Sequence, residues 1–122
     1  MAKVTGLGGI FFKSSDPAAL SAWYAKHLGL AAEDWGGVRF NEDEQRAGYT
    51  LWSPFAADTT YFAPSPQPYM VNFRVDDLDA LLTQLRAEGV EVDERVESSE
   101  FGRFGWVMDL EGTRIELWQP PE

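Results

Sequence analysis

The chain has 122 residues and a formal charge of −10, from twenty acidic and ten basic side chains. Nucleic acids and anionic membrane surfaces attract basic side chains, so this charge disfavours both classes of partner. The chain has no cysteine, which excludes disulfides and thiolate metal ligands. The sequence shows no apolar run of the roughly 20 residues that a membrane span needs and no export signal, so we expect a cytoplasmic protein.

The first predicted elements are a short strand and a helix. Residues 9–13 (GIFFK) are typical of a strand that ends in a basic residue. Asp16 and Pro17 are typical of a helix start, and Gly29 is typical of its end. The single histidine, His27, lies in the last turn, where a helix favours a cation. We therefore expect His27 to be a partly exposed capping residue and not a metal ligand.

Two further short strands and a connector follow. Residues 38–40 (VRF) and 49–52 (YTLW) have strand composition. The segment after them carries prolines 54, 64, 66 and 68, and proline removes backbone donors and stiffens the chain. We predict a semi-rigid connector over residues 54–68, which lets the two halves pair either within one chain or between two chains.

The second half repeats the order of the first. Residues 70–74 (MVNFR) predict a strand, and Asp77 and Gly89 mark the start and end of a second helix. Three more strands are predicted at residues 90–96, 104–108 and 114–118, the last two joined by a hairpin turn. The sequence TLWSP at 50–54 is echoed by ELWQP at 116–120. An internal duplication accounts for these similarities.

The closing motif DLEGTRIEL (109–117), the Asp-Pro helix start and the two βαβββ patterns together resemble the vicinal oxygen chelate superfamily. This superfamily includes glyoxalase I, bleomycin-resistance proteins and extradiol dioxygenases. The resemblance covers about residues 6–120. It implies one α+β domain over residues 1–122, made of two tandem βαβββ modules that form a cup-shaped, half-barrel mixed sheet with a helix packed outside each module. Module one would span about 6–53 and module two about 69–120.

The resemblance also implies four symmetric positions at which metal-dependent members hold their ion. On this chain they are Gly9, Thr50, Met70 and Glu116. Divalent metals of this superfamily prefer imidazole and carboxylate ligands, and only Glu116 is a competent ligand. We therefore expect no metal and no cofactor.

Side chains alternate along a strand, so the residues that share a face with these positions would line the cup. The candidate substrate-binding residues are Phe11, Lys13, Thr50, Trp52, Met70, Asn72, Arg74, Trp106 and Trp118. The alternative for each aromatic residue is a place in the core, and for each basic residue a surface ion pair. The segment 98–103 is a further candidate, as a flap that touches ligand through Glu100 and Arg103.

Glu116 is the candidate catalytic residue. A carboxylate among tryptophans must find a cation, find hydrogen-bond donors, or take up a proton. Arg114, Lys13 or Arg74 would supply the cation. Otherwise Glu116 acts as a general base, as a binding acceptor for a cationic or hydroxylated group, or remains as the relic of a metal site.

Three functions remain open at this point. The first is metal-independent binding of a small organic molecule in an aromatic pocket, as in bleomycin-resistance proteins. The second is a lyase, isomerase or dioxygenase-type enzyme that uses Glu116. The third is a regulatory or structural dimer whose cup is packed shut. The resemblance further implies a homodimer.

Overall fold

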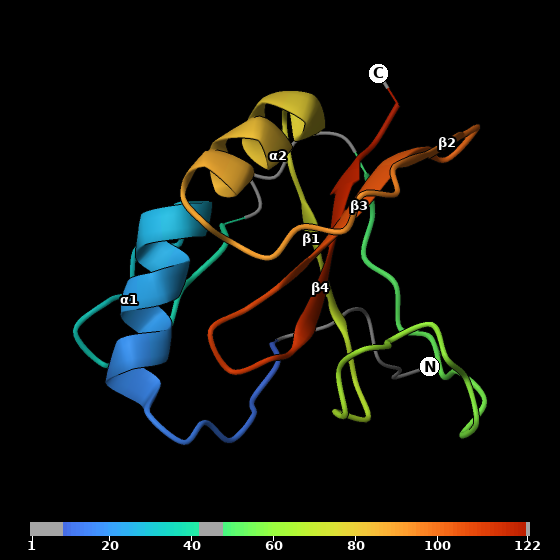
Figure 1. Cartoon of the computed structure of the whole chain (residues 1–122). Coiled ribbons are helices and arrows are strands. Elements are labelled where there is room, and N and C mark those ends of the chain that lie inside the picture. Colours follow the sequence, from blue (N-terminus) through green and yellow to red (C-terminus); the bar gives the residue numbers. More distant parts are fainter. Residues whose placement is uncertain (1–8, 42–47, 122) are drawn as a thin grey trace, which may run out of the picture.

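A computed structural model of the chain describes residues 9–41 and 48–121. The described elements are α1 (Pro17–Leu28), β1 (Val71–Arg74), α2 (Leu78–Ala87), β2 (Glu97–Ser99), β3 (Gly102–Met108) and β4 (Arg114–Gln119). The strands form one mixed sheet in the order β1-β4-β3-β2 (Figure 1). The pair β1–β4 is parallel, and the other two pairs are antiparallel. The expected α+β class is confirmed.

Both helices begin with the same capping arrangement. The Asp16 carboxylate accepts a hydrogen bond from the Ala19 N–H, and the Asp77 carboxylate accepts one from the Ala80 N–H, each at 3.1 Å. These bonds satisfy backbone donors that the first turn of a helix leaves without an intrahelical partner. Helix α1 ends at Gly29, whose φ of 71° is in the left-handed region that glycine tolerates best. The predictions of both helices are confirmed.

The hydrophobic core lies between α2 and one face of the sheet. Its buried members are Leu78, Leu82, Leu85, Val107, Ile115 and Leu117. A Cβ atom at Gly105 of β3 would stand only 3.1 Å from Cδ1 of Leu82, so the bare glycine lets α2 lie close to the sheet. Helix α1 adds Trp23, Tyr24 and Leu28 at the margin of this core.

Polar contacts attach α1 to the turn between β3 and β4. The Tyr24 hydroxyl donates to the Asp109 carboxylate at 2.8 Å, and burial together with this bond raises the pKa of Tyr24. The Glu111 carboxylate accepts from the Ser14 hydroxyl at 2.7 Å and from the Ser15 hydroxyl at 3.1 Å. The bond from Ser14 is the main cause that lowers the pKa of Glu111. These contacts join residues about 85–97 positions apart and fix α1 against the hairpin.

His27 connects the two helices. Its Nδ1 lies 2.8 Å from Oε1 of Glu88, and the Trp23 ring packs against its imidazole with the centroids 4.9 Å apart. The His27 side chain is only 8% exposed, so the expected partly exposed position is wrong. The hydrogen bond from His27 lowers the pKa of Glu88. His27 therefore has a structural role in helix packing.

The hairpin turn after β3 forms as predicted. The Asp109 carboxylate accepts from the backbone N–H of Glu111 at 2.8 Å and from that of Thr113 at 2.9 Å. Gly112 has a φ of 77°. An aspartate that binds the backbone two residues later, followed by a glycine with positive φ, is typical of a tight turn.

The strands expected in the first half do not form in the described residues. Residues 9–13, 38–40 and 49–52 form no strand, and most of their side chains are exposed. A strand needs a neighbouring strand for its backbone hydrogen bonds, and the described part of the chain supplies none here. Residues 6–8 of the expected first module, and residues 42–47 within it, lie outside the described residues. The tandem arrangement thus stays a prediction.

One strand of the second half lies later than expected. Residues 90–96 contribute only a bridge between Val92 and Val107, and β2 begins at Glu97. The Asp93 N–H donates to the Trp106 carbonyl, and the Met108 N–H donates to the Glu91 carbonyl. These two bonds hold the segment beside β3 without a continuous ladder.

The segment of residues 48–69 runs along the side of the sheet opposite the helices (Figure 1). Tyr61 from this segment contacts Trp106, and Tyr49 contacts Trp118. No helix in the described residues has the length and apolar character required to cross a membrane. The face of the sheet beneath residues 48–69 carries the polar side chains considered next.

Candidate functional site

Three polar side chains lie in one row across the sheet. The strand register pairs Glu116 of β4 with Asn72 of β1 on one side and with Trp106 of β3 on the other. Directly paired residues point to the same face, so all three share the face turned away from α2. Alternation along β3 puts Phe104 and Met108 on this face as well.

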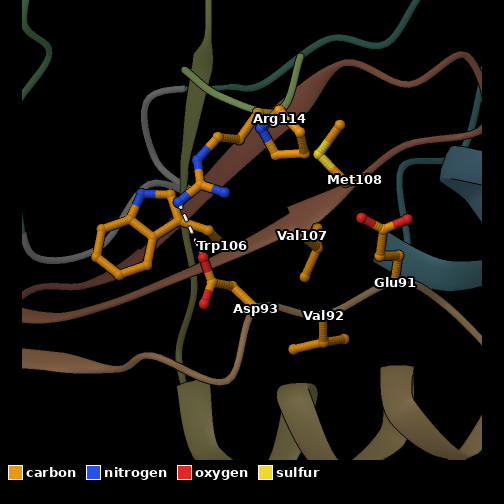
Figure 2. A pocket seen from close by; sticks show the side chains of 8 residues that line it. Glu91, Val92, Asp93, Trp106, Val107, Met108 and Arg114 are labelled. Atoms are coloured by element: carbon orange, nitrogen blue, oxygen red, sulfur yellow. Dashed lines mark hydrogen bonds and ion pairs between the residues drawn. The ribbon is translucent and has the colours of Figure 1, made fainter. Parts of the chain in front are cut away.

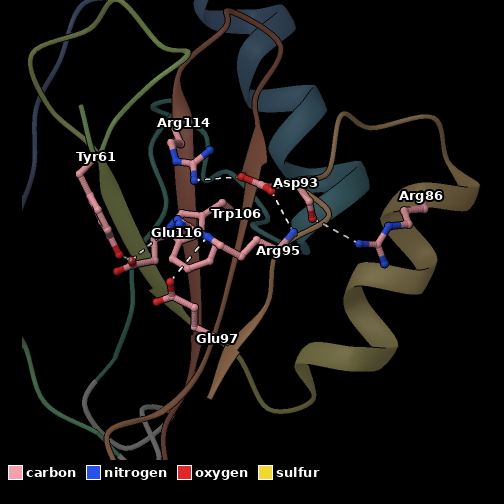
Figure 3. A network of polar contacts seen from close by, with 8 residues as sticks. All are labelled: Tyr61, Arg86, Asp93, Arg95, Glu97, Trp106, Arg114 and Glu116. Carbon is pink, nitrogen blue, oxygen red and sulfur yellow. Dashed lines mark hydrogen bonds and ion pairs between the residues drawn. The ribbon is translucent and has the colours of Figure 1, made fainter. Parts of the chain in front are cut away.

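Glu116 is the centre of this row. Its side chain is 9% exposed, and its carboxylate accepts three hydrogen bonds. Figure 3 shows Glu116 with two of the donors, Tyr61 and Trp106. Asn72 Nδ2 donates to Oε2 at 2.7 Å, Trp106 Nε1 donates to Oε1 at 3.1 Å, and the Tyr61 hydroxyl donates to Oε1 at 2.5 Å. The sequence left a cation, hydrogen-bond donors or a proton as possible partners of Glu116, and the structure provides neutral hydrogen-bond donors. These donors compensate for the loss of water around a buried carboxylate.

The expected cation Arg114 binds another acid. Its Nη2 lies 3.2 Å from Oδ2 of Asp93 (Figure 3). The hydrogen bond from the Arg95 backbone is the main cause that lowers the pKa of Asp93; the hydrogen bond from Arg114 lowers it further, and burial opposes them. Arg114 Nε is buried without a hydrogen-bond partner. Arg114 therefore belongs to a separate ion pair beside the Glu116 network.

Tyr61 is a site residue that the sequence did not reveal. Burial and the hydrogen bond to Glu116 raise the pKa of its hydroxyl, so the phenol keeps its proton and donates at neutral pH. The residue lies within the predicted proline-rich connector, where the only signal was the aromatic pair Tyr61-Phe62 among polar and small residues. Its place over the sheet depends on the path of the whole connector.

Trp106 is enclosed on several sides. It is 0% exposed, and the Tyr61 ring meets it edge-on with the centroids 6.2 Å apart. The guanidinium carbon of Arg95 lies 4.6 Å from the centroid of the Trp106 ring, and that of Arg114 lies 5.3 Å from it. Cations over an indole face are attracted by its electron-rich surface. Trp106 thus links the Glu116 network to the two arginines.

A hollow opens between Tyr61 and the β2–β3 hairpin, and we refer to it as the hairpin pocket. Its volume is about 420 Å³. The residues that line it are Tyr61, Glu97, Ser98, Ser99, Phe101 and Phe104. Ser98, Ser99 and Phe101 belong to the segment that the sequence predicted as a flap, whereas Glu100 and Arg103 of that segment are not among the lining residues.

A smaller pocket of about 110 Å³ lies near Arg114 and Met108 (Figure 2). Glu91 and Asp93 approach it from the segment beside β3, and Pro64 lines it from the connector. Small-molecule sites usually enclose several hundred cubic ångströms. The hairpin pocket is therefore the better candidate for an organic ligand.

The remaining predicted site residues separate into a group that packs on the Glu116 face of the sheet and a group on the surface. Trp118 and Arg74 form the first group. Trp118 is buried, donates from Nε1 to the Phe101 carbonyl at 2.7 Å, and stacks on Phe104. Arg74 shares the face of Glu116 and lies against Gly48, where a Cβ atom would be 2.6 Å from its Cδ. In the second group, Phe11 is 94% exposed and Trp52 is 82% exposed.

The other members of the second group are also on the surface. Lys13 and Thr50 are exposed, and Met70, just before β1, is half-buried. A binding role for these residues, and for Phe11 and Trp52, stays a prediction.

The residues at the four metal positions do not fit a divalent ion. Gly9 offers no side chain, Thr50 a weak hydroxyl and Met70 a soft thioether. The remaining position, Glu116, already accepts three hydrogen bonds from protein donors. Within residues 9–41 and 48–121, no group of three or more His, Cys, Asp or Glu side chains is placed to hold a metal ion.

The sequence profile of the Glyoxalase-like domain family matches residues 9–118. The chain belongs to this family. The match spans both the first half, where the described residues form only α1, and the sheet of the second half. A search of curated proteins finds no match.

Solved structures share the fold of this glyoxalase-like domain. TnmS3, an antibiotic binding protein from Streptomyces sp. CB03234, is 22% identical, with a TM-score of 0.64 over 99% of this chain and 100% of that one. TioX from Micromonospora sp. ML1 is 20% identical, with a TM-score of 0.51 over 89% and 91% of the two chains. Glyoxalase I of Leishmania major is 20% identical, with a TM-score of 0.50 over 85% and 78%. The resemblance to the vicinal oxygen chelate superfamily is confirmed.

Proposed function

We propose that this glyoxalase-like domain binds a small organic molecule in the aromatic hairpin pocket, without a metal ion. The observation that carries the proposal is that Glu116 is bound by Tyr61, Asn72 and Trp106, while the hollow beside Tyr61 stays open. A volume of about 420 Å³ lies within the range of small-molecule sites, and aromatic walls with a few polar groups are typical of them. The described function of TnmS3 as an antibiotic binding protein supports the same class of activity.

The bonds of Glu116 support the proposed metal independence. An ion at this carboxylate would have to displace at least one of its three donors, and the other three family positions offer no strong ligand. We expect elemental analysis of the purified protein to find no stoichiometric metal. Ligand affinity should be the same before and after treatment with a chelator, and a chelator-dependent loss would contradict the proposal.

Binding is better supported than catalysis. A general base needs a lone pair that faces the ligand, and Oε1 of Glu116 already accepts two hydrogen bonds while Oε2 accepts one. Tyr61 also lies between this carboxylate and the hairpin pocket, since it bonds to the first and lines the second. The role of Glu116 as a base remains a prediction.

We also propose that the chain acts as a homodimer. Large apolar side chains in the first half are exposed, among them Ile10, Phe11, Trp35, Leu51 and Trp52. In the described residues β1 pairs only with β4, so its other edge is open. Exposed large apolar side chains and open strand edges favour association. Light scattering of the purified protein should give twice the mass of one chain, and a monomer at micromolar concentration would contradict this.

The binding proposal is tested by native mass spectrometry of protein taken directly from cells, followed by titration of the ligand that is found. Phe101→Ala removes an exposed wall of the hairpin pocket, and we expect about tenfold weaker binding, which equals about 1.4 kcal/mol. Leu110→Ala is the matched control, because Leu110 is also exposed but lies in the β3–β4 turn outside the pocket. Equal affinities of the two variants would contradict this location of the site.

A further inference from the structure

The hairpin pocket has a distinct charge pattern. Its walls are the rings of Tyr61, Phe101 and Phe104, and its polar residues include two serines and one carboxylate, Glu97. None of the described residues that line it is a lysine or an arginine. The pocket therefore combines flat apolar surface with a single negative charge.

We propose that the hairpin pocket selects planar ligands that carry a positive charge, such as protonated aromatic amines, and that Glu97 is the residue that receives this charge. The inference rests on the proposed binding function and specifies its ligand class. An aromatic ring stacks on other rings, and a cation near aromatic faces gains from both the rings and the carboxylate. An anionic ligand would meet Glu97 without a compensating cation in the lining.

Arg95 is the charged residue that competes for Glu97. Its Nε lies 3.6 Å from Oε1 of Glu97, and both side chains are about half exposed. An ion pair between exposed groups contributes only about 0–1 kcal/mol, so a ligand cation can replace Arg95 at small cost. Arg95 also keeps a second partner, because its guanidinium lies over the Trp106 ring (Figure 3).

Ser99 adds a preference for a ligand acceptor. Its hydroxyl oxygen accepts from the Phe101 N–H at 3.1 Å, and the hydroxyl still has its own hydrogen to donate. The side chain of Ser98 is paired in register with Arg103 and therefore shares the opposite face, where Arg103 Nη1 donates to the Ser98 hydroxyl at 2.8 Å and Arg103 Nη2 pairs with Asp79 at 2.6 Å. A planar cation with a ring nitrogen or carbonyl oxygen fits the Ser99 donor.

The net charge of the whole chain also favours cationic ligands. A net charge of −10 attracts cations over distances of about one Debye length, roughly 10 Å at moderate salt. Encounter with a cationic ligand is therefore favoured before any contact forms.

The experiment compares three tricyclic probes of nearly equal shape: cationic aminoacridine, neutral acridone and anionic acridine carboxylate. Their dissociation constants are measured with the full-length protein at pH 7, for the parent chain, Glu97→Gln and Glu94→Gln. Glu94 is the matched control, because it is exposed, lies three residues away and does not line the pocket. Circular dichroism confirms that both variants fold.

We expect the parent chain and Glu94→Gln to bind aminoacridine about fivefold more tightly than acridone, and Glu97→Gln to lose this preference, as for one exposed ion pair. Added salt should weaken the binding of the cationic probe aminoacridine and leave the binding of neutral acridone unchanged. The inference would be overturned if acridone bound as tightly as aminoacridine, if the anionic probe bound more tightly than the cationic one, or if Glu97→Gln had no effect on the preference. None of these results would contradict the proposed function. Absence of binding by all three probes would also overturn it. The proposed function is tested separately, by the ligand search, the chelator treatment and the Phe101→Ala variant described above.

Discussion

Replacing Glu116 by leucine should lower the free energy of unfolding by about 3 kcal/mol, because buried donors lose their acceptor. The Trp106 indole N–H is in a fully buried residue and cannot turn to water, so it bears the full cost of desolvation. Tyr61 and Asn72 are less buried and can find water in place of the carboxylate. The expected loss is therefore nearer to the cost of one or two unsatisfied donors than of three.

The matched control is Glu116→Gln. A glutamine keeps one carbonyl oxygen for Tyr61 and Trp106, and its amide N–H groups would face Asn72. The Asn72 amide can rotate to present its oxygen instead of its nitrogen, which restores the third hydrogen bond. We expect this variant to lose only about 1 kcal/mol, because hydrogen bonds to a charged acceptor are replaced by weaker ones between neutral groups.

Urea unfolding followed by circular dichroism measures both losses. Equal stability of the leucine and glutamine variants would contradict the donor network. The glutamine variant also tests the sequence-based prediction of a catalytic base, because it keeps the fold but cannot take up a proton. Ligand turnover that disappears in Glu116→Gln while ligand affinity is retained would support catalysis over simple binding.

The helices and the strands β1, β3 and β4 were predictable because their signals are local, whereas β2 lies later than the strand expected at residues 90–96. Asp16 and Asp77 each bind a backbone N–H three residues later, and a sequence pattern of that length is visible without knowledge of the fold. The turn at Asp109 is specified in the same way, by a carboxylate and a glycine within five residues. Alternation along β4 then put Glu116 and Trp118 on one face.

The first half could not be predicted with the same success. Residues 9–13 and 49–52 have strand composition, but composition does not supply a neighbouring strand, and their side chains remain largely exposed. Tyr61 escaped prediction because its position over Glu116 depends on where the connector crosses the sheet. The face of the sheet to which Trp106 points could not be predicted, because it depends on the pairing of Trp106 with Glu116 of β4. The sequence of β3 alone does not specify this register.

Replacing Trp106 by alanine should be the most destabilising single change in the site, with an expected loss of about 4 kcal/mol in the free energy of unfolding. The ring is fully buried, and three neighbours lose a partner at once: Tyr61 its edge-to-face contact, and Arg95 and Arg114 the indole face. The cavity left behind lies between a sheet and a connector that carries prolines, which limits how far the surroundings can close over it.

Two further variants separate the causes of that loss. Trp106→Phe keeps an aromatic ring for the stacking contacts but removes the N–H that Glu116 accepts, so its expected loss is about 2 kcal/mol. Trp35→Ala removes an indole of the same size from an exposed position in the first half, and an exposed substitution should change stability by at most about 0.5 kcal/mol. Urea unfolding measures the three variants under the same conditions. If Trp106→Ala lost no more stability than Trp35→Ala, the connector would not cover Trp106 in solution, and the wall that Tyr61 gives to the hairpin pocket would be lost with it.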